Sequence, residues 1–357
     1  MLPCVRLILA LLLVITSAAL LISCGRNDLH RYQSFAFGTL IEIKIRSDDS
    51  TLADQASARL FSDFDKMHRD WHAWEPGKLT QTSSLLANST WFTADKSVLE
   101  LISLSKQYSL QSEGLFNPVI GKLIGAWGFH DAGQPEKPPS QAEIDALLQD
   151  LPTVSDIDID GDKIRGHNPE IKLDLGAIAK GFAVAAGIQK LRQQGIQHAL
   201  INAGGDLCGI GSQGKRPWRI GIRNPSGEGI IASIELADDE CVFTSGDYER
   251  YFSYDGKRYH HIIDPRNGYP ADKSVSVTVL HQNGAIADAA STALFIAGPE
   301  SWQGIAAKMG VSSIMMVDRQ GRIILTPSMQ KRIKLEESAA HHQIIISNPL
   351  ATGSLLN

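Results

Sequence analysis

Two hydrophobic periods alternate along this chain, and their order limits the folds it can adopt. Residues 39–46 and 274–281 alternate apolar and polar side chains, which is the pattern of half-buried strands. Residues 52–67 and 177–194 instead carry apolar side chains at helical spacing. Residues 218–263 have the pattern of a run of antiparallel strands. We therefore expect an α+β fold, with mixed, largely antiparallel sheets packed against helices.

The same patterns predict further elements. They are helices at 98–108, 285–297 and 302–309, a strand at 171–175, and hairpins at 157–164 and 314–325. No repeat period is present, and the Pro- and Gly-containing loop 133–140 is the best candidate for a domain boundary. The chain body is therefore either one domain or two intertwined subdomains.

The N-terminal segment has the pattern of a targeting signal. Residues 7–22 are apolar or small and follow Arg6; a bilayer span needs about 20 such residues. The segment ends in Leu21-Ile22-Ser23-Cys24, which looks like a bacterial lipobox with a lipidated cysteine. A plain secretory signal or an uncleaved anchor is the alternative. We expect a signal peptide over 1–23, and lipidated Cys24 with a tether over 24–34. The protein would then be anchored to a membrane of the bacterial cell envelope and face the periplasm, with the inner and outer membranes both open.

Charge and cysteine content narrow the choice of partners. The formal net charge is -5, which argues against a broad nucleic-acid surface but leaves a local anion pocket open. Outside the expected signal and lipobox, the cysteines are Cys208 and Cys241. The expected compartment would permit a disulfide between them, but their spacing does not require one.

A candidate metal site lies in the predicted helix 285–297. Positions i, i+3 and i+4 share one helix face, so Asp288, Ser291 and Thr292 would present a carboxylate and two hydroxyls together. These hard oxygen ligands suit Mg²⁺ rather than zinc. The commoner explanation of such a pattern is a small polar cluster near a helix start.

A candidate phosphate site lies at residues 174–181, where a predicted strand passes through a glycine into a helix. Free N–H groups at a helix start attract phosphate, and Lys180 would add a positive charge. Asp174 stands where a loop carboxylate could hold a ring N–H or a sugar hydroxyl. The alternative is a surface lysine and a turn aspartate. The glycine pair in the segment 202–206 allows close approach by a ligand, but it fits a plain turn equally well.

Two adjacent histidines, His260 and His261, offer a candidate for proton transfer. Neighbouring residues on a strand face opposite sides, so only one of the two can point into a given site. The commoner arrangement is one histidine in the core and one in solvent. Aromatic residues in loop-like contexts could stack on a flat heterocycle or fill a core edge.

Nine segments occur in an order that resembles the FAD:protein FMN transferase family, also called the ApbE or flavin-trafficking lipoprotein family. The segments are 37–39, 72–76, 114–118, 127–129, 174–181 (DLGAIAKG), 201–206 (INAGGD), 244–248 (TSGDY), 260–270 (HHIIDPRNGYP) and 287–295 (ADAASTALF). The resemblance implies an ApbE-like, T-fold-related domain over residues 35–325. The tail, 326–357, matches nothing in it and has no assigned role. Phe37 stands where the family often has Met, and residues 79–83 depart from the family pattern.

The resemblance implies an enzyme that binds FAD as substrate together with Mg²⁺. It would transfer FMN to a threonine hydroxyl of a target flavoprotein, such as a subunit of a redox or respiratory complex, and release AMP. The implied metal ligands are Asp288, Ser291, Thr292 and the backbone carbonyl of Ala177. Lys180 would hold phosphate oxygens, and His261 is the candidate general base. The implied flavin or adenine contacts are Phe37, Trp74, Leu115, Phe116, Asn117, Asp174 and Ile262.

Two alternatives remain at this point. The same site could serve a Mg²⁺-dependent FAD pyrophosphatase that yields FMN and AMP, because water could replace the threonine. A non-catalytic flavin-binding lipoprotein is the other alternative. It predicts a degraded metal triad, whereas Asp288, Ser291 and Thr292 are all present. We therefore expect an enzyme.

Overall fold

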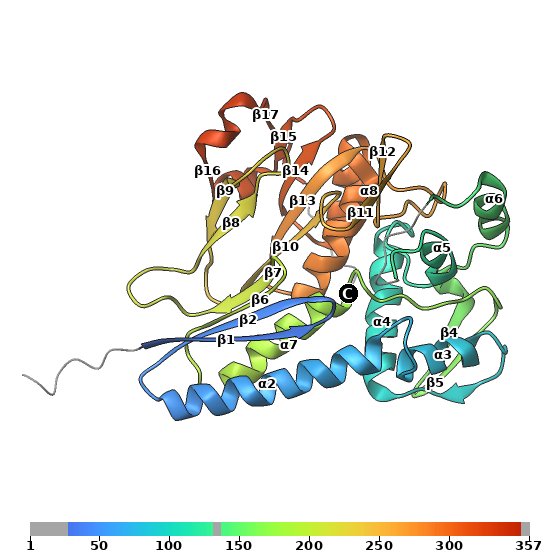
Figure 1. The fold of residues 1–357 in the computed structure, drawn as a ribbon, viewed down its shortest axis with the longest axis horizontal. Helices are drawn as coiled ribbons and strands as arrows, with labels where there is room; N and C mark the ends of the chain where they lie inside the picture. Colours follow the sequence, from blue (N-terminus) through green and yellow to red (C-terminus); the bar gives the residue numbers. More distant parts are fainter. Residues whose placement is uncertain (1–27, 131–136, 351–357) are drawn as a thin grey trace, which may run out of the picture.

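A nine-stranded sheet forms the centre of the structure (Figure 1). The computed structural model describes residues 28–130 and 137–350. In spatial order the strands are β1 (Asp28–Ala36), β2 (Thr39–Ser47), β6 (Ala199–Ala203), β7 (Asp206–Ile210), β10 (Glu240–Gly246), β13 (Ser274–His281), β14 (Ser313–Asp318), β15 (Ile323–Leu325) and β17 (Ile344–Ile346). Neighbouring strands are antiparallel except β15 and β17. The predicted α+β class with largely antiparallel sheets is confirmed.

Three long helices cover one face of this sheet: α2 (Ser50–Trp71), α7 (Ala179–Gln193) and α8 (Gly284–Met309). The alternation that predicted β2 has a direct cause, because Ile41, Ile43 and Ile45 are fully buried against these helices. The two helices predicted at 285–297 and 302–309 are the halves of α8. They meet at a kink where Gly298 adopts φ 70° and Pro299 follows.

A smaller sheet covers the opposite face, with the order β16 (Ile333–Leu335), β9 (Ile230–Glu235) and β8 (Arg219–Arg223). The tail after residue 325, to which the sequence assigned no role, contributes strands to both sheets. It supplies β16 to the small sheet and β17 to the edge of the large one, with α9 (Pro327–Gln330) and the 3₁₀ helix η2 (Glu337–His341) around them. Residues 326–350 are thus part of the packed fold.

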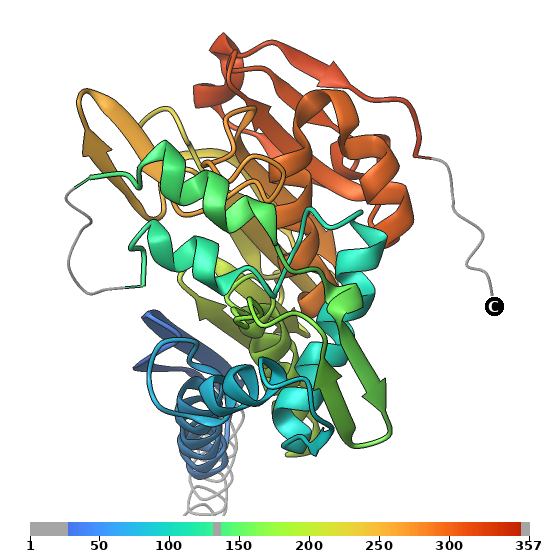
Figure 2. The ribbon, with the colours of Figure 1, turned by 90° about the vertical axis from the view of Figure 1, so that its right-hand side faces the viewer.

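The rest of the chain forms a helical region beside the long helices (right in Figure 1). It contains α3 (Lys78–Leu86), β3 (Phe92–Thr93), α4 (Lys96–Gln111), α5 (Gly121–Ala126), α6 (Gln141–Gln149), η1 (Val154–Asp156), β4 (Ile157–Asp160) and β5 (Lys163–Gly166). In Figure 2, α5 and α6 lie side by side. A small core joins them to the separate hairpin β11 (Tyr251–Tyr254) and β12 (Lys257–His260). The antiparallel run predicted over 218–263 is therefore divided among three sheets.

The prediction of a strand at 171–175 is wrong, because this segment is not a strand of any sheet. Ile171, Leu173 and Leu175 are buried in alternation, as a half-buried strand would be. Their backbone, however, bonds to the loop at 118–121: Lys172 N donates to Val119 O at 3.2 Å, and Gly121 N donates to Lys172 O at 2.8 Å. Period-two burial therefore marks an extended segment whose partners form a loop rather than a strand.

Several predictions fall outside the described residues. They are the signal peptide over 1–23, the lipobox ending at Cys24, and residues 133–136 of the loop 133–140. Among residues 28–130 and 137–350, no helix has both the length and the apolar content needed to cross a bilayer.

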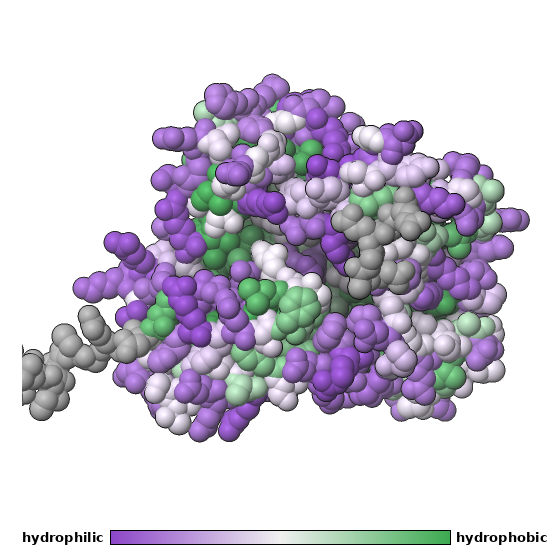
Figure 3. All heavy atoms as spheres, viewed as in Figure 1, coloured by the Kyte–Doolittle hydropathy of each residue, from purple (hydrophilic) through white to green (hydrophobic). Residues whose placement is uncertain are grey.

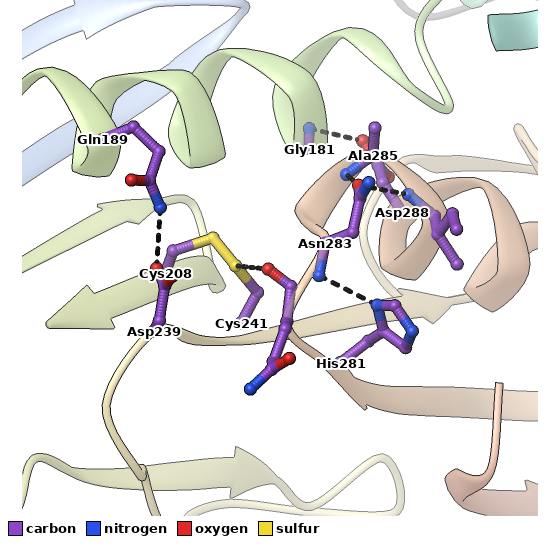
Figure 4. The surroundings of a disulfide bond; sticks show 11 residues. Gly181, Gln189, Cys208, Asp239, Cys241, His281, Asn283, Ala285 and Asp288 are labelled. Carbon is purple, nitrogen blue, oxygen red and sulfur yellow. Dashed lines mark hydrogen bonds between the residues drawn. A yellow bond between two sulfur atoms is a disulfide. The ribbon is translucent and has the colours of Figure 1, made fainter.

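Cys208 and Cys241 form a disulfide, which the sequence left open. The two residues are register partners on β7 and β10. Their side chains lie beside the middle of α7, near Gln189, and beside the start of α8, near Asn283 and Ala285 (Figure 4). The bridge thus cross-links two central strands below the helices that carry the candidate phosphate and metal residues.

Reducing this disulfide should lower the free energy of unfolding by about 3–4 kcal/mol, because the cross-link restrains a loop of this length in the unfolded chain. The two cysteines are 33 positions apart. Urea unfolding with and without a reductant measures the change. The double variant Cys208→Ala/Cys241→Ala should show no response to the reductant. An unchanged midpoint in fully reduced wild-type protein would contradict the prediction.

Candidate functional site

The starts of α7 and α8 touch each other through Gly181 and Asp288. Gly181 N donates a hydrogen bond of 2.8 Å to Asp288 Oδ2, and both residues are buried (Figure 4). A Cβ on Gly181 would lie 2.3 Å from Gly284 O and 2.6 Å from Asp288 Cβ. Only glycine allows this approach. The structure therefore brings the candidate phosphate segment and the candidate metal helix into direct contact.

This contact also frees a backbone carbonyl. In a regular helix Gly181 N would donate to the carbonyl four residues earlier, that of Ala177. Here that N–H is directed to Asp288 instead. Among the described residues no backbone hydrogen bond ends on Ala177 O. The carbonyl therefore keeps its lone pairs, as a metal ligand must.

The two predicted hydroxyl ligands differ in exposure. Ser291 is 1% exposed, whereas Thr292, one residue later on α8, is half-buried. Both contact Ser245 on β10: its Oγ lies 2.8 Å from Ser291 Oγ and 3.1 Å from Thr292 Oγ1. The TSGDY segment that contains Ser245 drew attention in the sequence, but Ser245 itself was not predicted as a site residue.

Lys180 follows the turn of the phosphate segment and forms an ion pair with Asp206. Asp206 is buried at the start of β7, and its Oδ1 accepts a hydrogen bond of 3.1 Å from Thr244 N. Burial lowers the pKa of Lys180, but the Asp206 and Asp288 carboxylates outweigh it and raise that pKa above its usual value. Asp206 was not predicted as a site residue, because the glycine pair before it fits a plain turn as well as a ligand contact.

Burial raises the pKa of Asp288 to about 7, with Asp206 adding to the effect and Lys180 opposing it. A buried carboxyl of this kind is stabilised in its charged form by a nearby cation. The available donors are one carboxylate, hydroxyls and a free carbonyl, which is the oxygen chemistry that Mg²⁺ accepts. In the part of the chain that the structure describes, no three or more His, Cys, Asp or Glu side chains form a metal cluster. The residues present therefore fit a hard cation.

The two histidines have different environments. His260 is buried, its Nε2 lies 2.8 Å from Ala271 O, and burial lowers its pKa to about 4. His261 is half-buried, and its Nδ1 lies 3.2 Å from Arg250 O. Since a carbonyl can only accept, Nδ1 donates and the neutral ring keeps its lone pair on Nε2. Burial, followed by the nearby Arg250, His260 and Lys180, holds the pKa of His261 well below its usual value.

Two of the predicted flavin contacts are accessible aromatics. Phe37 forms the β1–β2 turn with φ 53° and packs edge-on against Phe64 at 6.0 Å between ring centroids. Trp74 stacks on His130 at 4.1 Å between centroids, and Lys172 Nζ lies 3.5 Å from the Trp74 ring centre. Trp74 also lines an open hollow of about 440 Å³ with residues 75–77, 80, 81 and 84.

The side chains of the other predicted contacts are buried in cores or form hydrogen bonds within the protein. Leu115, Phe116 and Ile262 are buried in cores, so any ligand contact there would involve their backbone or an edge. Asn117 Nδ2 donates to Pro152 O at 3.1 Å, and Asp174 Oδ1 accepts from Gly176 N at 2.9 Å. The segments 115–118 and 171–174 do lie side by side, because Asp174 N donates to Pro118 O at 2.8 Å.

The tip of the β1–β2 hairpin next to Phe37 carries an exposed apolar pair. Phe35 and Leu40 are register partners and are 67% and 51% exposed. Hydrophilic side chains dominate the face drawn in Figure 3, where apolar areas are small and scattered. This hairpin tip is one of those areas.

Comparisons with known proteins show the family of the chain. The model of the ApbE family matches residues 37–315. The chain is 42% identical over 303 residues to an FAD:protein FMN transferase of Rhodobacter capsulatus. The matched region covers 85% of this chain and 58% of the Rhodobacter protein. The chain is also 31% identical over 327 residues to an FAD:protein FMN transferase of Klebsiella pneumoniae, covering 89% and 98%.

Solved structures give the same result for the fold. The ApbE protein of Thermotoga maritima has a TM-score of 0.78 at 28% identity, covering 85% of this chain and 99% of that one. The apo form of the Pseudomonas stutzeri flavinyl transferase ApbE has a TM-score of 0.75 at 28% identity, covering 85% and 96%.

Proposed function

Because the chain belongs to the ApbE family, we propose that it transfers FMN from FAD to a threonine hydroxyl of an acceptor flavoprotein and releases AMP. The observation that carries this proposal is the Gly181–Asp288 hydrogen bond of 2.8 Å. It joins a helix start suited to phosphate with a helix that presents oxygen ligands. Phosphoryl transfer depends mainly on such positioning and on charge neutralisation.

Asp288, Thr292 and the carbonyl of Ala177 would hold Mg²⁺ beside the FAD pyrophosphate. When bound, the ion would neutralise the charge that develops on the phosphate oxygens. Lys180, neutralised in part by Asp206, would orient one of those oxygens. With the cation and Lys180 in place, neutralising the pyrophosphate charge would need few further charged side chains from the protein.

His261 would take the proton of the acceptor hydroxyl at Nε2. The threonine oxygen would form a bond to the phosphorus of the FMN half, the P–O bond of the pyrophosphate would break, and AMP would leave with the bridging oxygen. The lowered pKa of His261 keeps the ring neutral at physiological pH, with the lone pair on Nε2 free to take a proton.

We also propose that the chain acts at the periplasmic face of a membrane of the cell envelope, anchored through lipidated Cys24. The lipobox-like segment 21–24 supports this location. The Cys208–Cys241 disulfide is a second, independent support, because such bonds persist in oxidising compartments. The acceptor would then be a flavoprotein subunit exposed on the same side.

The proposal is tested by incubating the protein with FAD and Mg²⁺, with and without an acceptor domain that carries the target threonine. AMP release and acceptor mass are followed together. We expect a mass gain of one FMN that is lost on adding EDTA. AMP and free FMN with an unmodified acceptor would indicate a pyrophosphatase. FAD binding without AMP would leave a flavin-binding protein.

Replacing His261 with asparagine should lower the transfer rate by about 10²–10⁴-fold, the usual contribution of general base catalysis. FAD affinity should change little. At saturating Mg²⁺, which favours the charged form of Asp288, the acid limb of the wild-type pH–rate profile should lie below pH 6.5, because the lowered pKa keeps His261 neutral there. His30→Asn is the matched control, since His30 is also half-buried and bonds a backbone carbonyl, Ser47 O, at 3.1 Å. Wild-type transfer rates in His261→Asn would remove it as the base.

Replacing Lys180 with alanine should weaken FAD binding by about 10-fold or more, since a charged hydrogen bond is worth roughly 1.5–3 kcal/mol. Titration of FAD by its fluorescence measures the change. Lys190→Ala is the control, because Lys190 is on the same helix and pairs with Asp63 away from the site. Equal affinities in the two variants would move the phosphate site elsewhere.

A further inference from the structure

Three hydroxyl groups form a continuous chain between β10 and α8. Ser245 Oγ lies 2.8 Å from Ser291 Oγ and 3.1 Å from Thr292 Oγ1. Ser291 Oγ in turn donates to the backbone carbonyl of Asp288 at 2.9 Å. This hydroxyl chain therefore begins or ends at Thr292, next to the proposed metal ligands.

The direction of this chain follows from counting protons. Each hydroxyl has one proton to donate and two lone pairs to accept with. The proton of Ser291 is used on the Asp288 carbonyl, so Ser291 can only accept from Ser245. The proton of Ser245 is then used as well, so Ser245 can only accept from Thr292. All three hydroxyls thus donate in the same direction, away from Thr292.

This direction makes Thr292 different from Ser291. Thr292 Oγ1 gives its proton to Ser245 and accepts no hydrogen bond from the described residues, so both of its lone pairs are available. Ser291 has one lone pair occupied and is 1% exposed. Thr292 also stands one helical turn after Asp288, on the same face. Of the two hydroxyls, Thr292 is therefore the one prepared to bind a cation.

We propose that Ser245 is a positioning residue for the metal site: it accepts the proton of Thr292 and so keeps that proton away from the cation. This rests on the proposed function, in which Asp288 and Thr292 hold a divalent cation. Without Ser245, the hydrogen bond that orients the Thr292 proton is lost, and that proton is free to rotate toward the cation, where it is repelled.

The strand that carries Ser245 is held in register on both sides of the site. Ser245 pairs with Val277 on β13, and its neighbour Thr244 donates its N–H to Asp206 at 3.1 Å. Asp206 is the partner of Lys180. β10 therefore fixes the hydroxyl chain and the lysine of the phosphate site relative to each other.

The test is the affinity of the flavin-free protein for Mn²⁺, used in place of Mg²⁺ and followed by the electron paramagnetic resonance signal of the free ion. We expect Ser245→Ala to weaken Mn²⁺ binding by about 5–10-fold, the loss of one net hydrogen bond. Ser245→Thr, which keeps the hydroxyl, should restore most of the affinity. In transfer assays the Ser245→Ala variant should need more Mg²⁺ but approach the wild-type rate when Mg²⁺ is saturating.

Thr278→Val is the matched control, because Thr278 Oγ1 makes a hydroxyl pair of 2.9 Å with Thr244 on the same two strands without reaching α8. It should bind Mn²⁺ like the wild type. Wild-type affinity in Ser245→Ala, or a Ser245→Thr variant as weak as Ser245→Ala, would overturn the inference while leaving the metal site in place. A wild-type protein that binds no Mn²⁺, or binds it unchanged after Asp288→Asn, would overturn the metal site of the proposed function and this inference with it.

Discussion

Replacing Asp288 with asparagine should abolish Mg²⁺-dependent transfer, with a rate loss of at least about 10²–10³-fold. Asp288 is the carboxylate of the proposed cation site, and a metal ion contributes several kcal/mol of charge stabilisation in such reactions. The fold should survive, because the asparagine Oδ1 can still accept the hydrogen bond from Gly181 N. The change also removes a charge that burial disfavours, as the raised pKa of Asp288 indicates.

The measurement is AMP release as a function of Mg²⁺, combined with thermal unfolding of the same samples. Asp318→Asn is the control, since Asp318 is fully buried on β14 and pairs with Arg322 away from the site. It should keep its Mg²⁺ response even where it unfolds more easily. Full Mg²⁺-dependent activity in the Asp288→Asn variant would show that the cation is held elsewhere.

Replacing Gly181 with alanine should destabilise the protein by about 3 kcal/mol or more and remove activity. An added methyl group would overlap the backbone at Gly284 O, 2.3 Å away, and Asp288 Cβ, 2.6 Å away. Overpacking of this kind costs about 1–3 kcal/mol in a relaxed core and more where backbone must move. α7 and α8 would have to separate, which would break the Gly181–Asp288 hydrogen bond.

Gly304→Ala provides the matched control for this prediction. Gly304 also lies in a helix, α8, but nothing stands within 4 Å of its added Cβ. Alanine there should stabilise the protein by up to about 1 kcal/mol, the usual helix preference over glycine. Urea unfolding of the two variants should therefore give opposite signs. A Gly181→Ala protein as stable as the wild type would mean that the two helices can part without cost.

The elements with clear periodicity were predicted correctly, and the failures have a shared physical cause. β2 matched its alternating pattern because one of its faces is buried against the helices. Residues 274–281 do form the strand β13, but the expected half-burial is wrong, because residues 276–280 are all buried between the helices and the smaller sheet. Residues 171–175 have the same burial pattern as β2 but pair with a loop. The burial of a segment can be predicted from the order of its apolar residues. The partner of its backbone hydrogen bonds cannot, because that partner does not affect which side chains are apolar. For the same reason the antiparallel run at 218–263 could not be divided among its three sheets.

In the candidate site, residue types and helical spacing predicted Asp288, Ser291 and Thr292 as metal ligands, because i, i+3 and i+4 neighbours share a face in any helix. Lys180 was predicted from its place at a helix start. These roles stay predictions. Ser245 and Asp206 could not be found in this way, because they reach the site from separate strands, β10 and β7. The ladder of the central sheet sets where they stand.

The order of motifs and the local periods were thus sufficient for the fold class and the family, and they supplied the candidates for most polar residues of the site. The tertiary structure decided three other points: the joining of Cys208 and Cys241, the glycine contact between α7 and α8, and the direction of the hydroxyl chain at Thr292. Each of these depends on contacts between residues 33 or more positions apart. Such contacts are set by packing and register, which no local segment of the chain encodes.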